Sequence, residues 1–203
     1  MTTARNLLIV AMDTAPDNPV KSGELSLALA GAELIDLLGA EAIELDEDRI
    51  VPTGGAAPTD RVLAEAAAAL RREKPYEQLG DWLWRRGDSL AGAYAAGLEA
   101  EGLLVHRGGR RNPFRGDELV LIDSPARREA TESWNSLDPA LVTLGEAVGV
   151  QGERDTDLPQ IADDRVAAVL AAVSDALVEL EAVRRRRSIE QAGFDNVWRG
   201  LDE

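Results

Sequence analysis

The chain has 203 residues, 45% hydrophobic and 29% charged, with a formal net charge of -15. This length and composition predict a globular protein with one well-buried core, exclude a disordered chain, and argue against broad adsorption to nucleic acid or membranes. The absence of cysteine excludes disulfides, thiol catalysis and thiolate metal sites, and the single histidine, His106, excludes a histidine-based metal cluster.

The N-terminal part of the chain is predicted to form a short helix, a buried helix and a hairpin. Residues 4–13 predict the short helix, and residues 25–39 predict a helix that is apolar on nearly every side. A helix of that kind lies in the middle of a fold. Its two acids, Glu33 and Asp36, are one turn apart, and we expect them to cap or pair with a neighbouring element, with pKa tuning as the alternative. Residues 42–52 predict a small hairpin.

Three further helices are predicted from their capping residues. The first begins at Thr59 or Asp60 and ends at Pro75. The second begins with Pro75 in its first turn and stops at Gly87. The third is capped by Asp88 and runs to the next turn.

Two tryptophans lie close together in the second of these helices, at positions 82 and 84. Residues two apart on a helix do not share a face. Trp82 aligns with the apolar positions and is predicted to be core. Trp84 is freer and can rim a pocket, because an indole combines an apolar body with one polar N–H.

After residue 102 the sequence predicts a second hairpin and three helices. Residues 103–106 are expected to pair with residues 119–122. Ser124 and Asp138 each precede a proline, so a helix is expected to begin at each. Apolar residues at helical spacing predict a long helix over residues 162–184.

The end of that long helix carries a run of four arginines, residues 184–187. Cations at a helix C-terminus interact favourably with the helix dipole, by about 0.3 to 1 kcal/mol. We expect that role, with a lipid or partner patch as the alternative.

Residues 150–159 are predicted to form a connection that is too short to force a second domain. A tail segment follows with the apolar residues Phe194, Val197, Trp198 and Leu201.

A second basic cluster is predicted at the turn of the second hairpin. This stretch contains no acid, and its notable residues are Arg107, Arg110, Arg111, Phe114 and Arg115. An aromatic beside cations is typical of a shallow membrane-insertion device, in which each cation contributes about 1 kcal/mol near an anionic leaflet. The alternative is a solvated loop whose arginines pair with the acidic body while Phe114 folds back onto it.

The chain lacks the motifs of the common catalytic and nucleotide-binding sites. No Gly-x-Ser-x-Gly, Gly-x-Gly-x-x-Gly or Gly-Lys-Ser/Thr pattern occurs, and the glycines of "VPTGGAAPTD" lack the lysine and the strand-to-helix context of a phosphate loop. A histidine-containing triad could form only around His106. We therefore expect no enzymatic activity, no cofactor and no metal.

Five segments in order carry a resemblance to a known family. They are "LALAGAELIDLLGAEAIEL", "APTDRVLAEAAAAL", "KPYEQLGDWLWRRG", "LEAEGLLV" and "SLDPALVTLGEAVGV". In this order and with similar spacing they resemble the Golgi phosphoprotein 3 family, and the chain is identified as a bacterial member from about Leu7 to the late helix. The resemblance implies a mainly α fold. The resemblance further implies a single domain, residues 1–203, with a buried central helix, surrounding amphipathic helices and one or two short β-hairpins.

The resemblance also implies a ligand. Eukaryotic members are peripheral membrane proteins that bind phosphatidylinositol 4-phosphate and help retain glycosyltransferases. The family's hairpin carries apolar residues that dip into the bilayer, with basic residues beside them. By ungapped alignment, the four positions of the family's lipid pocket fall at or near Lys21, Ala30, Asp88 and Ala91. The nearest basic residues, Lys21, Arg85 and Arg86, are the candidates for contact with a lipid headgroup.

Three functional hypotheses follow. The first is a cytoplasmic, peripherally membrane-associated adaptor that binds an anionic phospholipid or phosphoinositide. The second is a soluble interaction module that uses the hairpin to engage a protein partner or a second copy of the chain. The third is a winged-helix nucleic-acid binder with residues 89–101 as recognition helix, but that helix nearly lacks donors for phosphates or base edges. The apolar run near the start is too short to span a membrane, and we expect neither secretion nor a transmembrane anchor.

Overall fold

The fold is mainly helical, as expected. A computed structural model describes residues 2–14, 20–55, 58, 60–107, 118–150 and 160–199, with the backbone alone at 14, 107, 118 and 192–199. These residues contain eight helices: α1 (Thr3–Thr14), α2 (Ser22–Gly39), α3 (Arg61–Ala69), α4 (Leu79–Arg86), α5 (Leu90–Ala100), α6 (Pro125–Asn135), α7 (Pro139–Ala147) and α8 (Asp164–Arg199). They also contain two antiparallel hairpins, β1 (Ile43–Asp46) with β2 (Arg49–Pro52) and β3 (Leu104–Arg107) with β4 (Glu118–Leu121).

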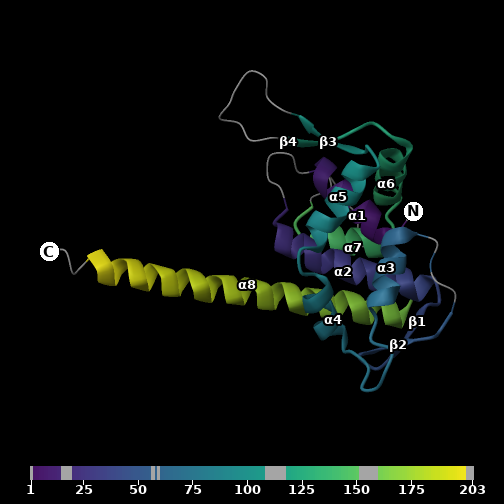
Figure 1. Ribbon diagram of the computed structural model, residues 1–203, viewed down its shortest axis with the longest axis horizontal. Helices are drawn as coiled ribbons and strands as arrows, with labels where there is room; N and C mark the ends of the chain where they lie inside the picture. Colours follow the sequence, from purple (N-terminus) through teal and green to yellow (C-terminus); the bar gives the residue numbers. More distant parts are fainter. Residues whose placement is uncertain are drawn as a thin grey trace.

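Helix α2 is the central helix of the body (Figure 1). Thirteen of its 18 residues are buried. The close approach of α8 depends on Gly31, because a Cβ there would lie 2.3 Å from Cγ2 of Val173. The prediction of a buried central helix is therefore confirmed. The helices that pack against α2 are α1, α3, α4, α5, α7 and α8.

One of the three acids of α2 caps a different helix. The carboxylate of Asp36 accepts hydrogen bonds from the backbone N–H groups of Thr3 at 2.8 Å and Ala4 at 3.1 Å. First-turn N–H groups such as these have no partner within their own helix. Burial raises the pKa of Asp36, while the two backbone bonds oppose that rise. The expected capping role is confirmed.

The second hairpin has the predicted register. Leu104 lies opposite Leu121, and Arg107 lies opposite Glu118. The backbone N–H of Ile122 donates to the carbonyl of Leu103 at 2.9 Å, which extends the same register by one pair.

The predicted start of α4 at Pro75 is wrong. The backbone N–H of Ile50 donates to the carbonyl of Glu77 at 2.9 Å, and that of Leu79 donates to the carbonyl of Asp48 at 2.8 Å. The segment before α4 therefore runs along the β1–β2 hairpin, and the helix begins only at Leu79. Helix α3 is correspondingly shorter than predicted and ends at Ala69.

The predicted cap of α5 is also wrong. Asp88 is not the N-cap; that residue is Ser89, which has a φ of 59° and forms no side-chain capping bond. The hydroxyl of Ser26, a buried residue of α2, accepts the hydrogen bond of the Ala91 N–H at 3.0 Å. A side chain from the central helix thus takes the capping role. The side-chain caps predicted at the starts of α3, α6 and α7 are confirmed at Asp60, Ser124 and Asp138.

Helix α8 is longer than predicted, and its arginines do not end it. The helix continues to Arg199, so residues 184–187 lie in its interior and the dipole explanation for them is wrong. Figure 1 shows the C-terminal half of α8 leaving the body. No proline follows Pro159, so the sequence contains no strong helix breaker where the apolar spacing ends. In the described parts of the chain, none of the helices could cross a membrane, because none is both long and apolar enough.

Candidate functional site

A cavity of about 600 Å³ lies where the start of α2 meets the end of α4, the α4–α5 turn and α8. The turn can lie against α2 because Gly87 has no side chain. A Cβ there would be 2.5 Å from the carbonyl oxygen of Leu83 and 3.3 Å from that of Ser26. The lining residues are Ser22, Gly23, Ser26, Leu27, Trp84, Arg85, Gly87, Asp88, Ser89 and Leu180.

The two tryptophans of α4 have the predicted environments, one in the core and one at the rim of the cavity. Trp82 is fully buried, and its indole N–H donates to the carbonyl of Ala30 at 3.4 Å. Trp84 is 38% exposed and lines the cavity. Its indole N–H donates to the carboxylate of Glu179 on α8 at 3.2 Å, which ties the end of α4 to α8.

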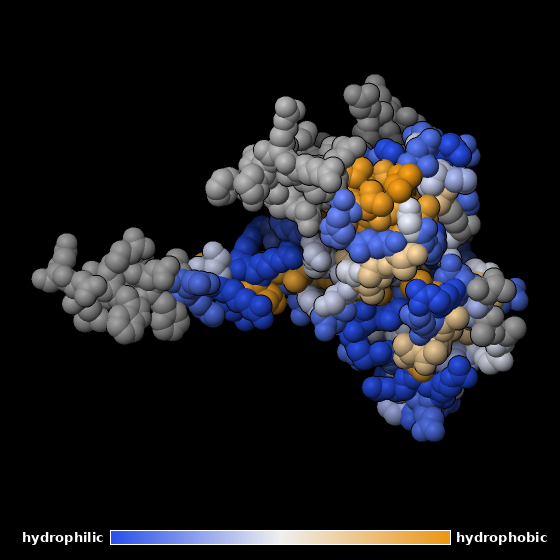
Figure 2. Space-filling view, turned by 45° about the horizontal axis from the view of Figure 1, so that its top comes forward, coloured by the Kyte–Doolittle hydropathy of each residue, from blue (hydrophilic) through white to orange (hydrophobic). Residues whose placement is uncertain are grey.

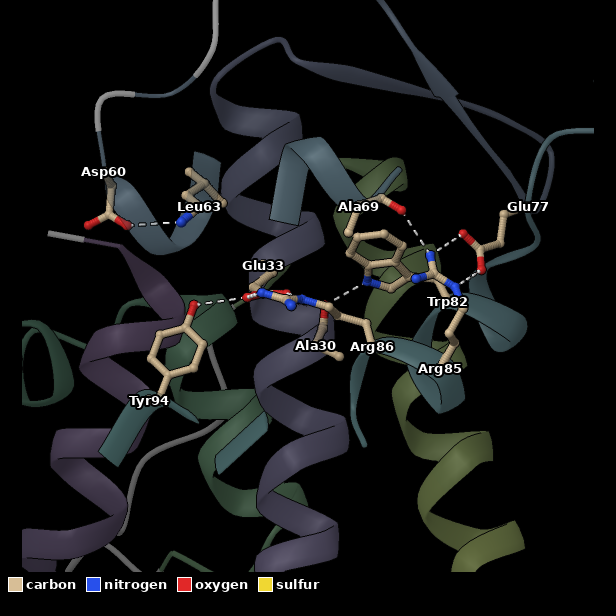
Figure 3. A network of polar contacts seen from close by, with 10 residues as sticks. All are labelled: Ala30, Glu33, Asp60, Leu63, Ala69, Glu77, Trp82, Arg85, Arg86 and Tyr94. Carbon is tan, nitrogen blue, oxygen red and sulfur yellow. Dashed lines mark hydrogen bonds and ion pairs between the residues drawn. The ribbon is translucent and has the colours of Figure 1, made fainter. Parts of the chain in front are cut away.

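Arg85 is the headgroup candidate that lines the cavity. Its Nε and Nη2 each donate to the carboxylate of Glu77 at 2.7 Å, and Nη2 also donates to the carbonyl of Ala69 at 3.1 Å (Figure 3). The guanidinium carbon lies 5.1 Å from the centre of the Trp82 ring. The hydrogen bonds to Glu77 raise the pKa of Arg85. Three hydrogen bonds therefore hold this side chain, and Glu77 already compensates its charge.

Arg86 points to the core rather than to the cavity. Its Nε and Nη2 donate to the two carboxylate oxygens of Glu33 at 2.8 Å, and the hydroxyl of Tyr94 donates to Glu33 at 3.2 Å (Figure 3). Glu33 is fully buried, so desolvation raises its pKa, although the pairing with Arg86 lowers it in part. Burial likewise raises the pKa of the Tyr94 hydroxyl. These three residues join α2, α4 and α5, and the expected pairing of Glu33 with a neighbouring helix is confirmed.

Lys21 precedes α2, and its ammonium lies 3.2 Å from the carboxylate of Glu24. Arg184 of α8 pairs with the same carboxylate. A Cβ on the cavity-lining Gly23 would lie 2.9 Å from Nη2 of Arg184, which places that guanidinium at the cavity edge. Sequence reasoning missed this position of Arg184. The signal was its spacing, since Arg184 follows Leu180 by four residues and shares its face.

The cavity does not have the strong positive field of a dedicated phosphate site. Arg85 faces Glu77, Arg184 faces Glu24, and Asp88 adds an acid to the lining. Specific binding of a phosphomonoester needs several convergent, charge-assisted donors. This arrangement instead offers serine hydroxyls beside two guanidinium groups that acids already compensate. Of the other aligned positions, Ala30 and Ala91 belong to the core.

The stem of the β3–β4 hairpin exposes apolar side chains. Val105 is 41% exposed, Leu119 37% and Ile122 41%. Figure 2 shows apolar side chains gathered on this part of the molecular surface. A two-stranded hairpin has no second layer to cover such residues. The side chain of Arg107 and the predicted contact residues Arg110, Arg111, Phe114 and Arg115 lie outside the described residues.

Comparison with protein families places almost the whole chain in one of them. The family model described as Golgi phosphoprotein 3 (GPP34) matches residues 4–192. The comparison with curated proteins found no match.

Across the described ranges, no group of three or more His, Cys, Asp or Glu side chains could hold a metal ion.

Proposed function

Because the chain belongs to the Golgi phosphoprotein 3 family, we propose that it is an adaptor that binds an anionic membrane surface through its β3–β4 hairpin. The family is one of non-enzymatic adaptors, so no catalytic activity is expected. Its members in general bind phosphatidylinositol 4-phosphate at Golgi membranes and associate with membranes peripherally. We propose that this protein binds at the cytoplasmic face of the membrane.

The observation that carries the proposal is the exposed apolar stem of the hairpin beside its basic turn. Val105, Leu119 and Ile122 remain in water unless something covers them. Burying such side chains in the headgroup and acyl boundary contributes about 0.8 kcal/mol for each CH₂ group removed from water. The arginines between residues 107 and 115 add attraction to an anionic leaflet, and screening limits their reach to about 10 Å at 0.1 M salt.

The three headgroup candidates, Lys21, Arg85 and Arg86, have different roles. Arg85, which lines the cavity, and Lys21, which precedes the cavity-lining Ser22, contact lipid phosphates. Arg86 acts as a positioning residue, because its two hydrogen bonds to Glu33 hold α4 against α2. Since acids compensate the cations around the cavity, binding depends on the anionic charge of the membrane and does not require a 4-phosphate.

Co-sedimentation with liposomes tests the proposal. Three compositions are compared: phosphatidylcholine alone, phosphatidylcholine with phosphatidylserine, and phosphatidylcholine with phosphatidylinositol 4-phosphate. We expect no binding to the first and comparable binding to the second and third when their surface charge is matched. Absence of binding to both charged compositions at 0.1 M salt would refute the membrane role. Binding confined to the third would refute the charge-based part alone.

Variants of the hairpin separate its two contributions. Arg110→Glu with Arg111→Glu should weaken binding more at low salt than at high salt, because those charges act through a screened field. Phe114→Ser should weaken binding with little change in salt dependence, by at most about 2 to 3 kcal/mol of lost apolar burial. The matched control is Arg71→Glu with Arg72→Glu, which makes the same change in net charge at two exposed residues far from the hairpin in sequence.

A second candidate function is an interaction module without lipid binding. The pairing of Arg85 with Glu77 and of Arg184 with Glu24 favours it, because compensated cations bind anions weakly. In that case neither charged liposome sediments the protein, and the apolar stem of the hairpin is the surface for a protein partner. A nucleic-acid role has less support, because α5 contains no basic residue.

A further inference from the structure

Helix α8 carries a second stripe of residues on the side that faces away from the core. Val169, Val173 and Ala176 pack inward. The opposite side exposes Val178 at 70% and Ile189 at 73%, the two most exposed large apolar side chains of the described residues. These two belong to a series spaced alternately by four and three residues, which is the spacing of a coiled-coil seam. The series, here called the outer stripe, is Ala171, Asp175, Val178, Ala182, Arg185 and Ile189.

The outer stripe is complementary to an antiparallel copy of itself. When two such helices are paired about residue 180, Ala171 lies opposite Ile189 of the second copy, and Val178 lies opposite its Ala182. The one acid of the stripe, Asp175, then lies opposite Arg185 of the second copy. Small residues thus meet larger apolar ones, and opposite charges meet one position inside each end of the seam. The overlap from residue 171 to residue 189 is about 27 Å long at 1.5 Å per residue.

The position of α8 in the fold leaves this side open. Among the described side chains, the last ion pair that ties the helix to the body joins Arg184 to Glu24, at the start of α2. Beyond it, the helix extends away from the body (Figure 1). In an antiparallel pair, each projecting half lies along the first half of the other copy's α8, on the side opposite that copy's body. The two bodies therefore lie on opposite sides of the seam, towards its opposite ends.

A groove beside the outer stripe matches the charge of the projecting half. It has a volume of about 480 Å³, a floor that includes alanines of α8, and four carboxylates in its lining: Glu47, Asp48, Asp175 and Glu179. No Lys or Arg lines it. The projecting half carries Arg185 and Arg186, and Arg186 forms no ion pair within the described part of the chain. Such complementarity steers association and sets its register.

We propose that the protein forms a homodimer through antiparallel pairing of α8 over residues 171–189, with the arginine-bearing part of each helix beside the acidic groove of the other copy. The occupant of the outer stripe is a second copy of this chain. This dimer is independent of the membrane role of the hairpin.

The mass of the full chain in solution is the first test. Light scattering coupled to size exclusion should give twice the 21.8 kDa of one chain. A mass of one chain at all concentrations up to the millimolar range would overturn the proposal.

Charge exchange tests the register. Asp175→Arg and Arg185→Asp should each yield single chains, because each places like charges opposite one another in both of the charged pairs of the seam. A mixture of the two variants should recover the dimer mass, because both facing pairs then have opposite charge. Arg187→Asp is the matched control, since residue 187 lies on the other side of the helix, and it should stay dimeric. A dimer that neither single variant affects uses another surface, and that result would overturn the proposal.

Disulfide trapping tests the direction of pairing, since the chain has no native cysteine. Under oxidation, Ala171→Cys mixed with Ile189→Cys should give a cross-linked dimer, while either variant alone should not. In the antiparallel pair, two copies of the same cysteine lie about 27 Å apart, which is far beyond the reach of a disulfide. Cross-linking of each variant with itself would show a parallel pair and would refute the antiparallel arrangement.

Discussion

Replacing Arg86 by methionine isolates the cost of leaving Glu33 without its partner. Glu33 is fully buried, while Arg86 retains 19% exposure of its side chain. Removing one partner of a buried ion pair costs about 3 to 5 kcal/mol. Uptake of a proton by Glu33 limits this penalty. With an unfolded pKa of 4.5, protonation at pH 7 costs about 1.36 kcal/mol for each of about 2.5 pH units, or about 3.4 kcal/mol.

The same reasoning predicts how the penalty depends on pH. At pH 5.5 only about one pH unit separates the solution from the unfolded pKa, so the cost of protonating Glu33 falls to about 1.4 kcal/mol. The difference in the free energy of unfolding between wild type and Arg86→Met should therefore shrink between pH 7 and pH 5.5, by at most about 2 kcal/mol, because the raised pKa of Glu33 gives the wild type part of the same pH dependence. Urea unfolding at both pH values measures this, and the melting temperature should drop by about 2 to 4 °C per kcal/mol.

The control for this experiment is Arg128→Met. Arg128 forms an exposed ion pair with Asp123, with side-chain exposures of 60% and 76%. Its loss should cost less than about 1 kcal/mol at either pH. The reasoning about Glu33 is refuted if Arg86→Met is no more destabilising than this control at pH 7, or if its penalty does not shrink at pH 5.5.

Three further predictions concern the core and its caps. Burial raises the pKa of Glu33, so its contribution to stability is present below pH 4.5 and is lost as pH rises through the folded-state pKa. Relative to Glu33→Gln, the wild type should therefore lose stability in urea titrations as pH rises above 4.5. Asp60→Ala should cost about 1 kcal/mol, because Asp60 accepts hydrogen bonds from two first-turn N–H groups of α3, and an equal thermal midpoint for both proteins would contradict this. Gly31→Ala should cost about 1 to 3 kcal/mol through contact with Val173, although alanine is the better helix former. Gly31→Ala combined with Val173→Ala should cost less than the sum of the two single changes, and additivity in chemical denaturation would contradict the contact.

Local sequence determined most of the secondary structure, because the signals were complete within a few residues. Ser124 and Asp138 each stand before a proline and cap their helices with their own side chains, as predicted. The pairing of residues 103–106 with 119–122 followed from the apolar runs that flank the turn on both sides. The order of five segments along the chain also indicated the family, which the match over residues 4–192 confirmed.

Only the tertiary structure decided what the polar side chains contact. Arg85 and Arg86 are neighbours in sequence, but Arg85 lines the cavity and pairs with Glu77, while Arg86 pairs with buried Glu33. Their sequence neighbours do not specify this, because each partner is brought near by the packing of helices. Arg86 and Glu33 are 53 residues apart.

The same limit explains the boundaries that sequence reasoning misplaced. The cap of α5 comes from Ser26 on α2, and the start of α4 is delayed by hydrogen bonds to the β1–β2 hairpin. The arginines at 184–187 lie inside α8 because its helical conformation continues past the last residue that the body covers. Apolar residues at helical spacing mark the part of a helix that packs against the body, so this spacing ends where α8 leaves the body. Backbone hydrogen bonds within the helix need no such cover, so α8 extends further than its apolar pattern.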